Sequence, residues 1–129
     1  MNGKYLLDTN IVILFLKKDN EIVEKIKELE EVYIPVTVFG ELYFGAYKSQ
    51  KVEENLKNIS NLLENVTVLE HSVNTAKIYG EIKNQLKEKG KPIPENDIWI
   101  AAIAKQHDLT VITNDIHFEE IEDLKLHSI

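Results

Sequence analysis

The sequence contains no cysteine and no arginine. Without cysteine, disulfides, thiolate nucleophiles and zinc–thiolate sites are excluded, which agrees with a reducing cytosol. Without arginine, the chain has no bidentate fork for phosphate or guanine and no arginine finger of its own. Any grip on phosphate must therefore come from its 15 lysines, from backbone N–H groups or from metal ions.

Long apolar runs and linker-like stretches are also missing. No apolar run reaches about 18 residues, the length that spans a membrane, and the start M-N-G-K-Y-L-L-D has no signal-peptide pattern. We therefore expect a cytoplasmic protein with no membrane contact. No repeat or Gly/Ser/Pro-rich linker divides the chain, so residues 1–129 are expected to form one domain. The net charge of −7 argues against nonspecific binding to nucleic acid, which depends on surface cations.

Short apolar segments alternate with amphipathic ones along the chain. The short segments predict strands at residues 4–7, 32–34, 66–69 and 110–113, with an edge strand within 124–129. The amphipathic segments predict helices that begin near residues 9, 20, 35, 52, 73 and 95. This alternation favours an α/β fold with a mainly parallel central sheet covered on both faces. In such sheets, sites form beyond the carboxyl ends of the strands.

Capping and apolar spacing predict how the helices begin and end and which faces they bury. Asn20 is predicted to cap the second helix, and Gly90 to stop the helix that begins near residue 73. The predicted buried faces are Val52, Leu56, Ile59 and Leu63 in the fourth helix, and Ala76, Tyr79, Ile82 and Leu86 in the fifth.

Four acidic residues stand alone in strongly apolar surroundings. Asp8 is the one charge in Y-L-L-D-T-N-I-V-I-L-F-L, Glu41 in V-T-V-F-G-E-L-Y-F-G-A-Y and Asp97 in D-I-W-I-A-A-I-A, while Asp115 closes L-T-V-I-T-N-D. Burying an unpaired carboxylate costs several kcal/mol, so each of these four acids needs a physical reason.

Each of the four acids also has an ordinary explanation. Asp8 could cap the helix that follows it, and Asp115 could be a turn residue. Asp97 would lie in a first helical turn, where the helix dipole favours an acid by roughly 0.3–1 kcal/mol. Glu41 lies in mid-helix, where it could occupy an exposed polar stripe.

Taken together, the four acids predict a metal site. Four clustered carboxylates cannot all ionise unless a cation neutralises them. Oxygen ligands without cysteine suit Mg²⁺ or Mn²⁺, which can acidify a bound water and orient it towards a phosphodiester. Neighbouring polar groups that could orient these carboxylates are Thr9, Asn10, Thr113 and Asn114.

The combined pattern resembles a known family. D-T-N after the first strand, a glutamate in a later apolar helix, N-D-I-W-I-A-A-I-A and T-V-I-T-N-D-I-H-F are similar, in this order, to PIN-domain ribonucleases, and among them to the VapC-type toxins of toxin–antitoxin pairs. The resemblance implies a three-layer α/β/α fold, in which the four acids bind metal and Asn10 and Thr113 support them. It further implies Mg²⁺- or Mn²⁺-dependent cleavage of structured RNA such as tRNA or rRNA, a homodimer, and inhibition by a small cognate antitoxin.

Two lysine clusters lie close in sequence to the four acids. Lys48 and Lys51 follow the helix that carries Glu41, and Lys89 and Lys91 precede Asp97. Either cluster could contact RNA backbone, but lysines at helix ends are also favoured by the helix dipole alone.

Several aromatic side chains and one histidine leave alternatives open. His117, two residues after Asp115, could act as a general acid or base, or have a loop or supporting role. Trp99 is expected in the core. Tyr43, Phe44 and Tyr47 could serve packing, a subunit contact or base stacking.

Other functions fit the pattern less well. A receiver-like signalling domain needs a phosphoacceptor aspartate after a middle strand, whereas V-T-V-L is followed by Glu70. A haloacid-dehalogenase-type phosphatase needs D-x-D after the first strand, where this chain has D-T-N. A PIN-like scaffold without activity would have no reason to keep four repelling acids. A housekeeping RNA-processing nuclease remains the alternative to a toxin.

Overall fold

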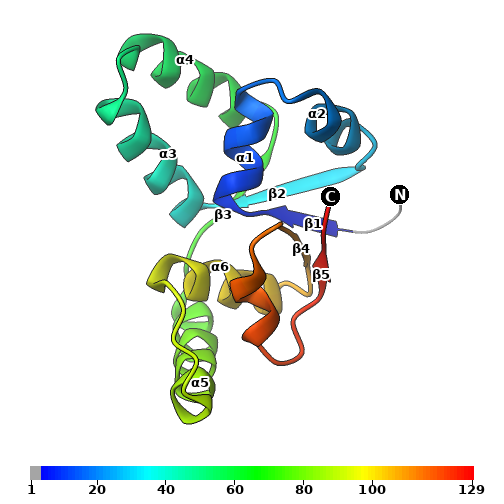
Figure 1. Ribbon diagram of the computed structural model, residues 1–129, viewed down its shortest axis with the longest axis vertical. Helices are drawn as coiled ribbons and strands as arrows, with labels where there is room; N and C mark the ends of the chain where they lie inside the picture. The colour runs from blue at the N-terminus through cyan, green and yellow to red at the C-terminus, as the bar shows by residue number, and fades with distance from the viewer. Residues whose placement is uncertain (1–3) are drawn as a thin grey trace.

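The central feature of the molecule is a five-stranded sheet with all neighbours parallel, in the order β3-β2-β1-β4-β5. The computed structural model describes residues 4–129. Within that range, all five predicted strands form, and Figure 1 shows them between two layers of helices. The strands are β1 (Lys4–Leu7), β2 (Glu31–Pro35), β3 (Thr67–Leu69), β4 (Thr110–Ile112) and β5 (Leu126–His127).

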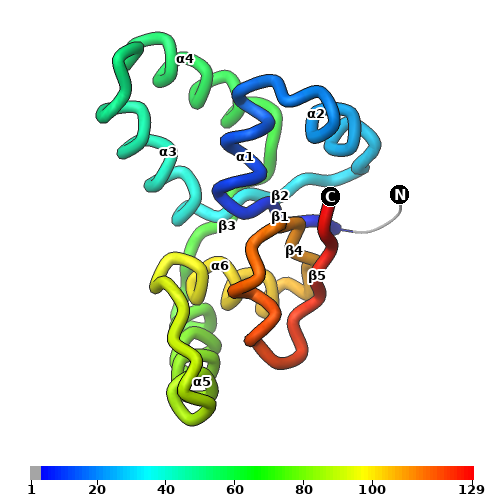
Figure 2. Tube along the Cα trace, in the orientation of Figure 1, coloured from blue at the N-terminus to red at the C-terminus, as the bar shows by residue number. Residues whose placement is uncertain are grey.

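The helices form one layer on each side of this sheet, which confirms the three-layer α/β/α prediction (Figure 1). The first layer contains α1 (Thr9–Leu16), α2 (Asn20–Lys27), α3 (Val36–Lys48) and α4 (Val52–Leu63). The second contains α5 (Val73–Lys89) and α6 (Glu95–Gln106). Figure 2 shows the chain leaving β4 through a short 3₁₀ helix, η1 (Ile116–Glu120), and returning to the edge of the sheet as β5. No helix within residues 4–129 combines the length and apolar character of a membrane span.

Burial is greatest in β1, β4 and α6. Leu6, Ile100 and Val111 are fully buried, and every residue of α6 from Ile100 to Ala104 is removed from solvent. Such a helix is apolar all round because it packs against both α5 and the sheet. The alanines at its centre allow close approach, so α6 is held rigidly and Asp97 in its first turn has a fixed position.

Within residues 4–129, side-chain caps begin three of the six α-helices, α1, α2 and α5. Asp8 caps α1, and a capping box formed by Ser72 and Thr75 begins α5. Gly90 ends α5 with a φ of 70°, the left-handed conformation that glycine adopts at little cost. The cap predicted for α2 is wrong by one residue, because Asp19, not Asn20, accepts the hydrogen bond from Ile22 N.

Two of the predicted apolar positions are wrong. In α4, Leu62 is buried and Leu63 is 36% exposed. In α5, Ile82 and Leu86 are buried as predicted, but Ala76 is exposed. Ala76 has only a methyl group, so its exposure sacrifices little apolar burial, and the helix is oriented by its larger side chains.

Candidate active site

The site lies beyond the carboxyl ends of β1 and β4, which are neighbours in the sheet. Asp8 directly follows β1, and Asp115 lies three residues beyond the end of β4. Because the two strands are parallel, their carboxyl ends lie at the same edge, as predicted.

Asp8 is both a helix cap and a buried member of the site. Its side chain is nearly inaccessible, with 3% of the residue exposed. One carboxylate oxygen accepts from Ile11 N at 3.0 Å, and the Thr113 hydroxyl donates to the other. Burial raises the pKa of Asp8 above its ordinary value, although these two hydrogen bonds oppose the shift. The capping explanation is therefore correct, but it does not remove the cost of burying this carboxyl group.

Thr113 joins two of the four acids. While its hydroxyl donates to Asp8, the hydroxyl oxygen accepts from Asp115 N at 2.9 Å. Thr113 is 5% exposed, so both bonds are shielded from water. One hydroxyl therefore fixes the ends of β1 and β4 relative to each other, and its supporting role at a metal site stays a prediction.

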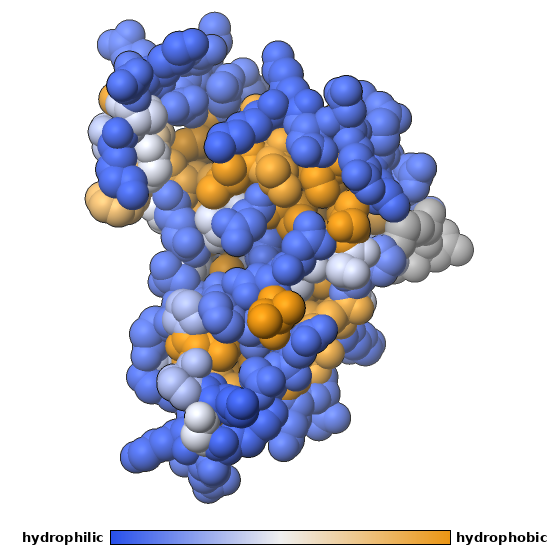
Figure 3. Space-filling view, in the orientation of Figure 1, coloured by the Kyte–Doolittle hydropathy of each residue, from blue (hydrophilic) through white to orange (hydrophobic). Residues whose placement is uncertain are grey.

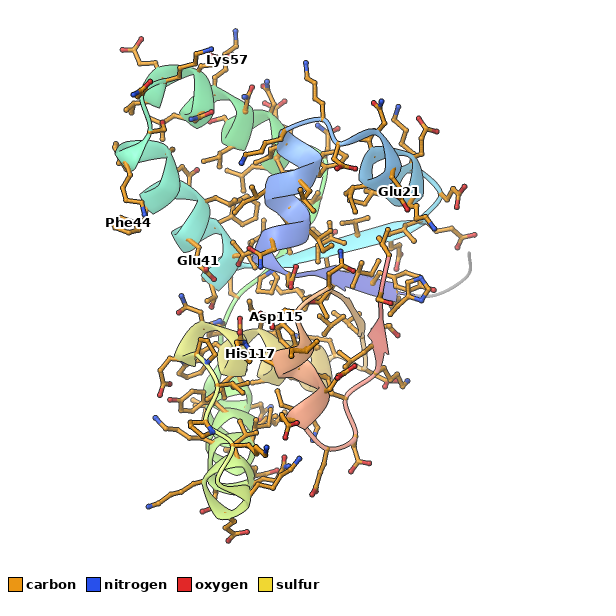
Figure 4. All side chains as sticks on the ribbon, viewed as in Figure 1. Glu21, Glu41, Phe44, Lys57, Asp115 and His117 are labelled. Atoms are coloured by element: carbon orange, nitrogen blue, oxygen red, sulfur yellow. The ribbon has the colours of Figure 1, made fainter. Side chains whose placement is uncertain are left out.

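Glu41 reaches the site from α3, which lies in the helix layer opposite to that of α6. It is half-buried, and the Thr9 hydroxyl donates to its Oε1 at 2.8 Å across 32 positions of sequence. Figure 4 shows Glu41 in the amino-terminal half of α3, with Asp115 and His117 lower in the view, on the segment after β4. This carboxylate is therefore held in place and is not a freely solvated group on a polar stripe.

The pKa of Asp97 is raised well above its ordinary value. Only 17% of its side chain is exposed, in the first turn of α6. Burial raises its pKa to about 6, and the negative charges of the other three acids, Asp115 foremost, add to the shift. The four acids therefore act on one another electrostatically, as a shared site requires.

The closest grouping in the site involves Asp97, Asp115 and His117. Ligand atoms of these three side chains lie within 4.8 Å of one another. The His117 Nδ1 atom is 3.1 Å from Asp115 Oδ1 and 3.8 Å from Asp97 Oδ2. Asp8 and Glu41 flank this group and are not part of it.

Within residues 4–129, neither predicted asparagine donates a side-chain hydrogen bond to any of the four acids. Asn10 is exposed. Asn114 Oδ1 accepts from Ile129 N at 3.3 Å, so its amide lies with the C-terminal segment. The hydroxyls of Thr9 and Thr113 provide the side-chain hydrogen bonds that orient the carboxylates.

An aromatic stack beside Asp97 was not predicted. Trp99 is half-buried and stacks on Tyr79 at a centroid distance of 4.0 Å and on His71 at 4.9 Å, with interplanar angles of 14° in both pairs. His71 Nε2 and Thr37 Oγ1 share a hydrogen bond of 2.7 Å, which links the stack to the start of α3. The expectation of a core tryptophan is therefore only partly correct. The partners come from distant parts of the chain, so no local motif indicates them.

The lysine clusters have mixed environments. Lys89 donates to the Glu120 carbonyl at 2.8 Å and lies 3.5 Å from its carboxylate, so it fastens α5 to η1. Lys48 lies over the Phe44 ring at 4.7 Å, and Lys51 is paired with Glu54 at 3.9 Å on the surface. Lys91 is exposed. Their contact with RNA stays a prediction.

The donor set fits a hard divalent cation. The segment after β1, helices α3 and α6, and the segment after β4 each contribute one carboxylate that could supply oxygen ligands. The pKa of Asp97 is raised by burial and then by the negative charges of the other acids, and a cation would relieve that negative field. A profile of the PIN domain matches residues 5–124. The chain belongs to the PIN-domain family. This assignment confirms the resemblance inferred from the four acids and their order.

Related PIN proteins are similar over nearly the whole chain. The ribonuclease VapC2 of Haemophilus influenzae is 37% identical over 125 residues, which cover 95% of each chain. The tRNA(fMet)-specific endonuclease VapC of Shigella flexneri is 32% identical, also over 95% of each chain.

Solved structures of PIN proteins confirm the fold. VapBC2 from Rickettsia felis, bound to a DNA fragment from its promoter, contains a chain with a TM-score of 0.92 and 30% identity, covering 98% of both chains. VapBC-1 from nontypeable Haemophilus influenzae gives a TM-score of 0.88 with 34% identity, covering 97% of both.

Proposed function

We propose that this PIN-domain protein is a divalent-metal-dependent endoribonuclease and the toxin of a toxin–antitoxin pair. The observation that carries the proposal is that Asp8, Glu41 and Asp115 lie near enough to Asp97 to add to the effect of burial, and together these effects raise its pKa to about 6. The similarity to VapC ribonucleases over 95% of the chain supports the choice of RNA as substrate.

The four acids are the residues that would hold Mg²⁺ or Mn²⁺. When bound, such an ion supplies Lewis acidity, acidifies an attacking water and stabilises charge that develops on the scissile phosphate. The chain contributes the positions: Thr113 orients Asp8, Thr9 orients Glu41, and the buried helix α6 fixes Asp97. The absence of arginine leaves charge neutralisation at the phosphate to the ion and to lysines.

Structured RNA, such as tRNA or rRNA, is the substrate that we propose. The net charge of −7 disfavours indiscriminate binding, so the RNA must be recognised by shape and by a few local contacts. Lys48, Lys51, Lys89 and Lys91 are the cations that we assign to the RNA backbone.

We place the antitoxin in an apolar groove between α1, α2, β2 and α4. The groove has a volume of about 860 Å³, and its lining includes Phe15, Leu16, Val23, Leu29 and Val32. Figure 3 shows apolar side chains exposed in a hollow on this side of the molecule. A patch of this kind on a small domain marks an interaction surface. The solved VapBC relatives are complexes of toxin and antitoxin, which supports an apolar antitoxin segment as the occupant.

We assign a homodimer contact to the outer face of α3. Phe44 and Tyr47 are each 65% exposed, and Val36 on the same helix is 43% exposed. Val36, Gly40 and Phe44 follow one another at four-residue intervals and so form a stripe. Figure 4 shows Phe44 pointing away from the rest of the molecule. Burial of this stripe against a second copy would remove exposed aromatic surface from water.

Cleavage of RNA by purified protein tests the proposal. The wild-type protein is expected to cut transfer or ribosomal RNA in Mg²⁺ or Mn²⁺ and to lose activity in EDTA. Asp8→Asn is expected to abolish cleavage with the fold intact, because asparagine caps a helix as well as aspartate does. Asp19→Asn is the matched control, since Asp19 caps α2 away from the site. Cleavage that survives Asp8→Asn or EDTA would refute the assignment.

A further inference from the structure

His117 is placed against two carboxylates of the site. Its Nδ1 atom is 3.1 Å from Asp115 and 3.8 Å from Asp97, as Figure 4 allows the reader to follow for the labelled pair. Within residues 4–129, this is the one group of three or more metal-ligating side chains whose ligand atoms come so close. The PIN-domain pattern of four acids does not include this imidazole.

The backbone holds the ring in this position. Asp115 Oδ1 accepts from His117 N at 2.9 Å and so begins η1, while the Thr113 hydroxyl accepts from Asp115 N. This turn brings the imidazole back towards the carboxylate that caps it. The His117 side chain is 50% exposed, which leaves space for an ion and its remaining waters.

We infer that His117 Nδ1 is a nitrogen ligand of the divalent ion held by Asp97 and Asp115, and that it makes this site selective for Mn²⁺ over Mg²⁺. This inference rests on the proposed function of the same site. Mg²⁺ prefers a shell of oxygen atoms in near-ideal octahedral geometry and gains little from imidazole. Mn²⁺ also prefers oxygen ligands and is the weakest binder of the first-row transition series, but as a member of that series it accepts an imidazole nitrogen more readily than Mg²⁺ does. One nitrogen among oxygen ligands should therefore shift the preference towards Mn²⁺.

A simple ion pair between a protonated His117 and the two carboxylates makes the opposite prediction. As a cation, His117 would compete with the metal, and its removal would tighten binding of Mg²⁺ and Mn²⁺ alike. If His117 is a ligand, its removal weakens metal binding, and the loss is greater for Mn²⁺ than for Mg²⁺. The sign of the change therefore separates the two roles.

Isothermal titration calorimetry tests this inference, with metal-free protein titrated separately with MnCl₂ and with MgCl₂. Loss of an outer-shell partner already costs about 10–100-fold in metal affinity, so His117→Ala is expected to weaken Mn²⁺ binding by at least about tenfold. Mg²⁺ affinity should change much less, and His117→Gln should behave like His117→Ala. His107→Ala, at the exposed end of α6, is the matched control and should bind both ions as the wild type does.

Pulsed EPR of the Mn²⁺-loaded protein gives a second readout that does not depend on activity. The wild type should show hyperfine coupling to a histidine nitrogen, and His117→Ala should lose it. Absence of that coupling in the wild type, equal weakening of both ions, or tighter binding by His117→Ala would overturn the inference. If RNA cleavage still required metal in that case, the proposed function would stand. If no metal bound at all, the proposed function would fail first.

Discussion

Replacing Asp97 by asparagine is expected to stabilise the metal-free protein at pH 7. The pKa of Asp97 is raised from 3.8 to about 6, chiefly by burial. At 1.36 kcal/mol per pH unit, an ionised Asp97 destabilises the folded state by about 3 kcal/mol. The neutral amide removes this cost but loses a favourable helix-dipole interaction of roughly 0.3–1 kcal/mol. The free energy of unfolding should therefore rise by about 2 kcal/mol, or roughly 8 °C in Tm for a domain of this size.

The increase in the free energy of unfolding caused by Asp97→Asn must depend on pH. Between pH 3.8 and about 6, the folded wild type binds more protons at Asp97 than the unfolded chain does, so its stability rises as the pH falls through this window. The difference between variant and wild type should thus be largest above pH 6 and shrink towards zero near pH 4. Urea unfolding in EDTA at pH 7 and pH 4 measures both values, with Asp19→Asn as the control that should show neither effect.

Bound metal should make the wild type more stable than Asp97→Asn, the reverse of the order expected in EDTA. An ion at one hundred times its Kd stabilises the wild type by about 2.7 kcal/mol, and Asp97→Asn lacks a ligand for it. In saturating Mn²⁺ the wild type should therefore be the more stable protein. The reasoning would be refuted if Asp97→Asn were less stable than wild type in EDTA at pH 7, or if its gain were equal at both pH values.

Four further changes test other parts of the molecule. Thr113→Val removes a buried hydroxyl that makes two hydrogen bonds, so it should lower the free energy of unfolding by about 1–3 kcal/mol and greatly weaken RNA cleavage. Thr113→Ser keeps the hydroxyl and should retain wild-type stability in urea unfolding and wild-type activity in RNA assays. The double substitution of Lys89 and Lys91 by glutamine should weaken RNA binding and flatten its salt dependence. An unchanged slope of RNA affinity against salt concentration would exclude these contacts. Phe44→Lys should convert a dimer to a monomer in sedimentation velocity, whereas weaker RNA affinity at unchanged mass would indicate base stacking. Val23→Glu, in the apolar groove, should leave cleavage intact but weaken inhibition by the cognate antitoxin, and full inhibition would place the antitoxin elsewhere.

The sheet and its site edge were predictable because they depend on short-range patterns. The apolar runs at β1 and β4 end in Asp8 and in Thr113, Asn114 and Asp115, and parallel strands place those ends together. The helix faces were less predictable. Leu62 and Leu63 are adjacent and equally apolar, so spacing alone could not decide which of them is buried.

The fine structure of the site depends on contacts between distant residues. Thr9 and Glu41 are 32 positions apart, and the stack of Trp99 with His71 depends on how the segment before α5 meets α6. The position of His117 depends on a single 3₁₀ turn after Asp115. Neither residue spacing nor composition contains these distances. The sequence could therefore nominate the four acids as candidates, while their hydrogen-bond partners could be named only in part.

The stack on Trp99 has a practical consequence. Trp99 is the single tryptophan of the chain, and it lies two residues from Asp97 on the same helix. Its emission therefore comes from one known place, with Tyr79 and His71 against its ring. A paramagnetic ion arriving beside Asp97, or a shift of α5 against α6, would change that emission directly. The protein thus carries an intrinsic fluorophore that reports on the surroundings of Asp97 without any attached dye.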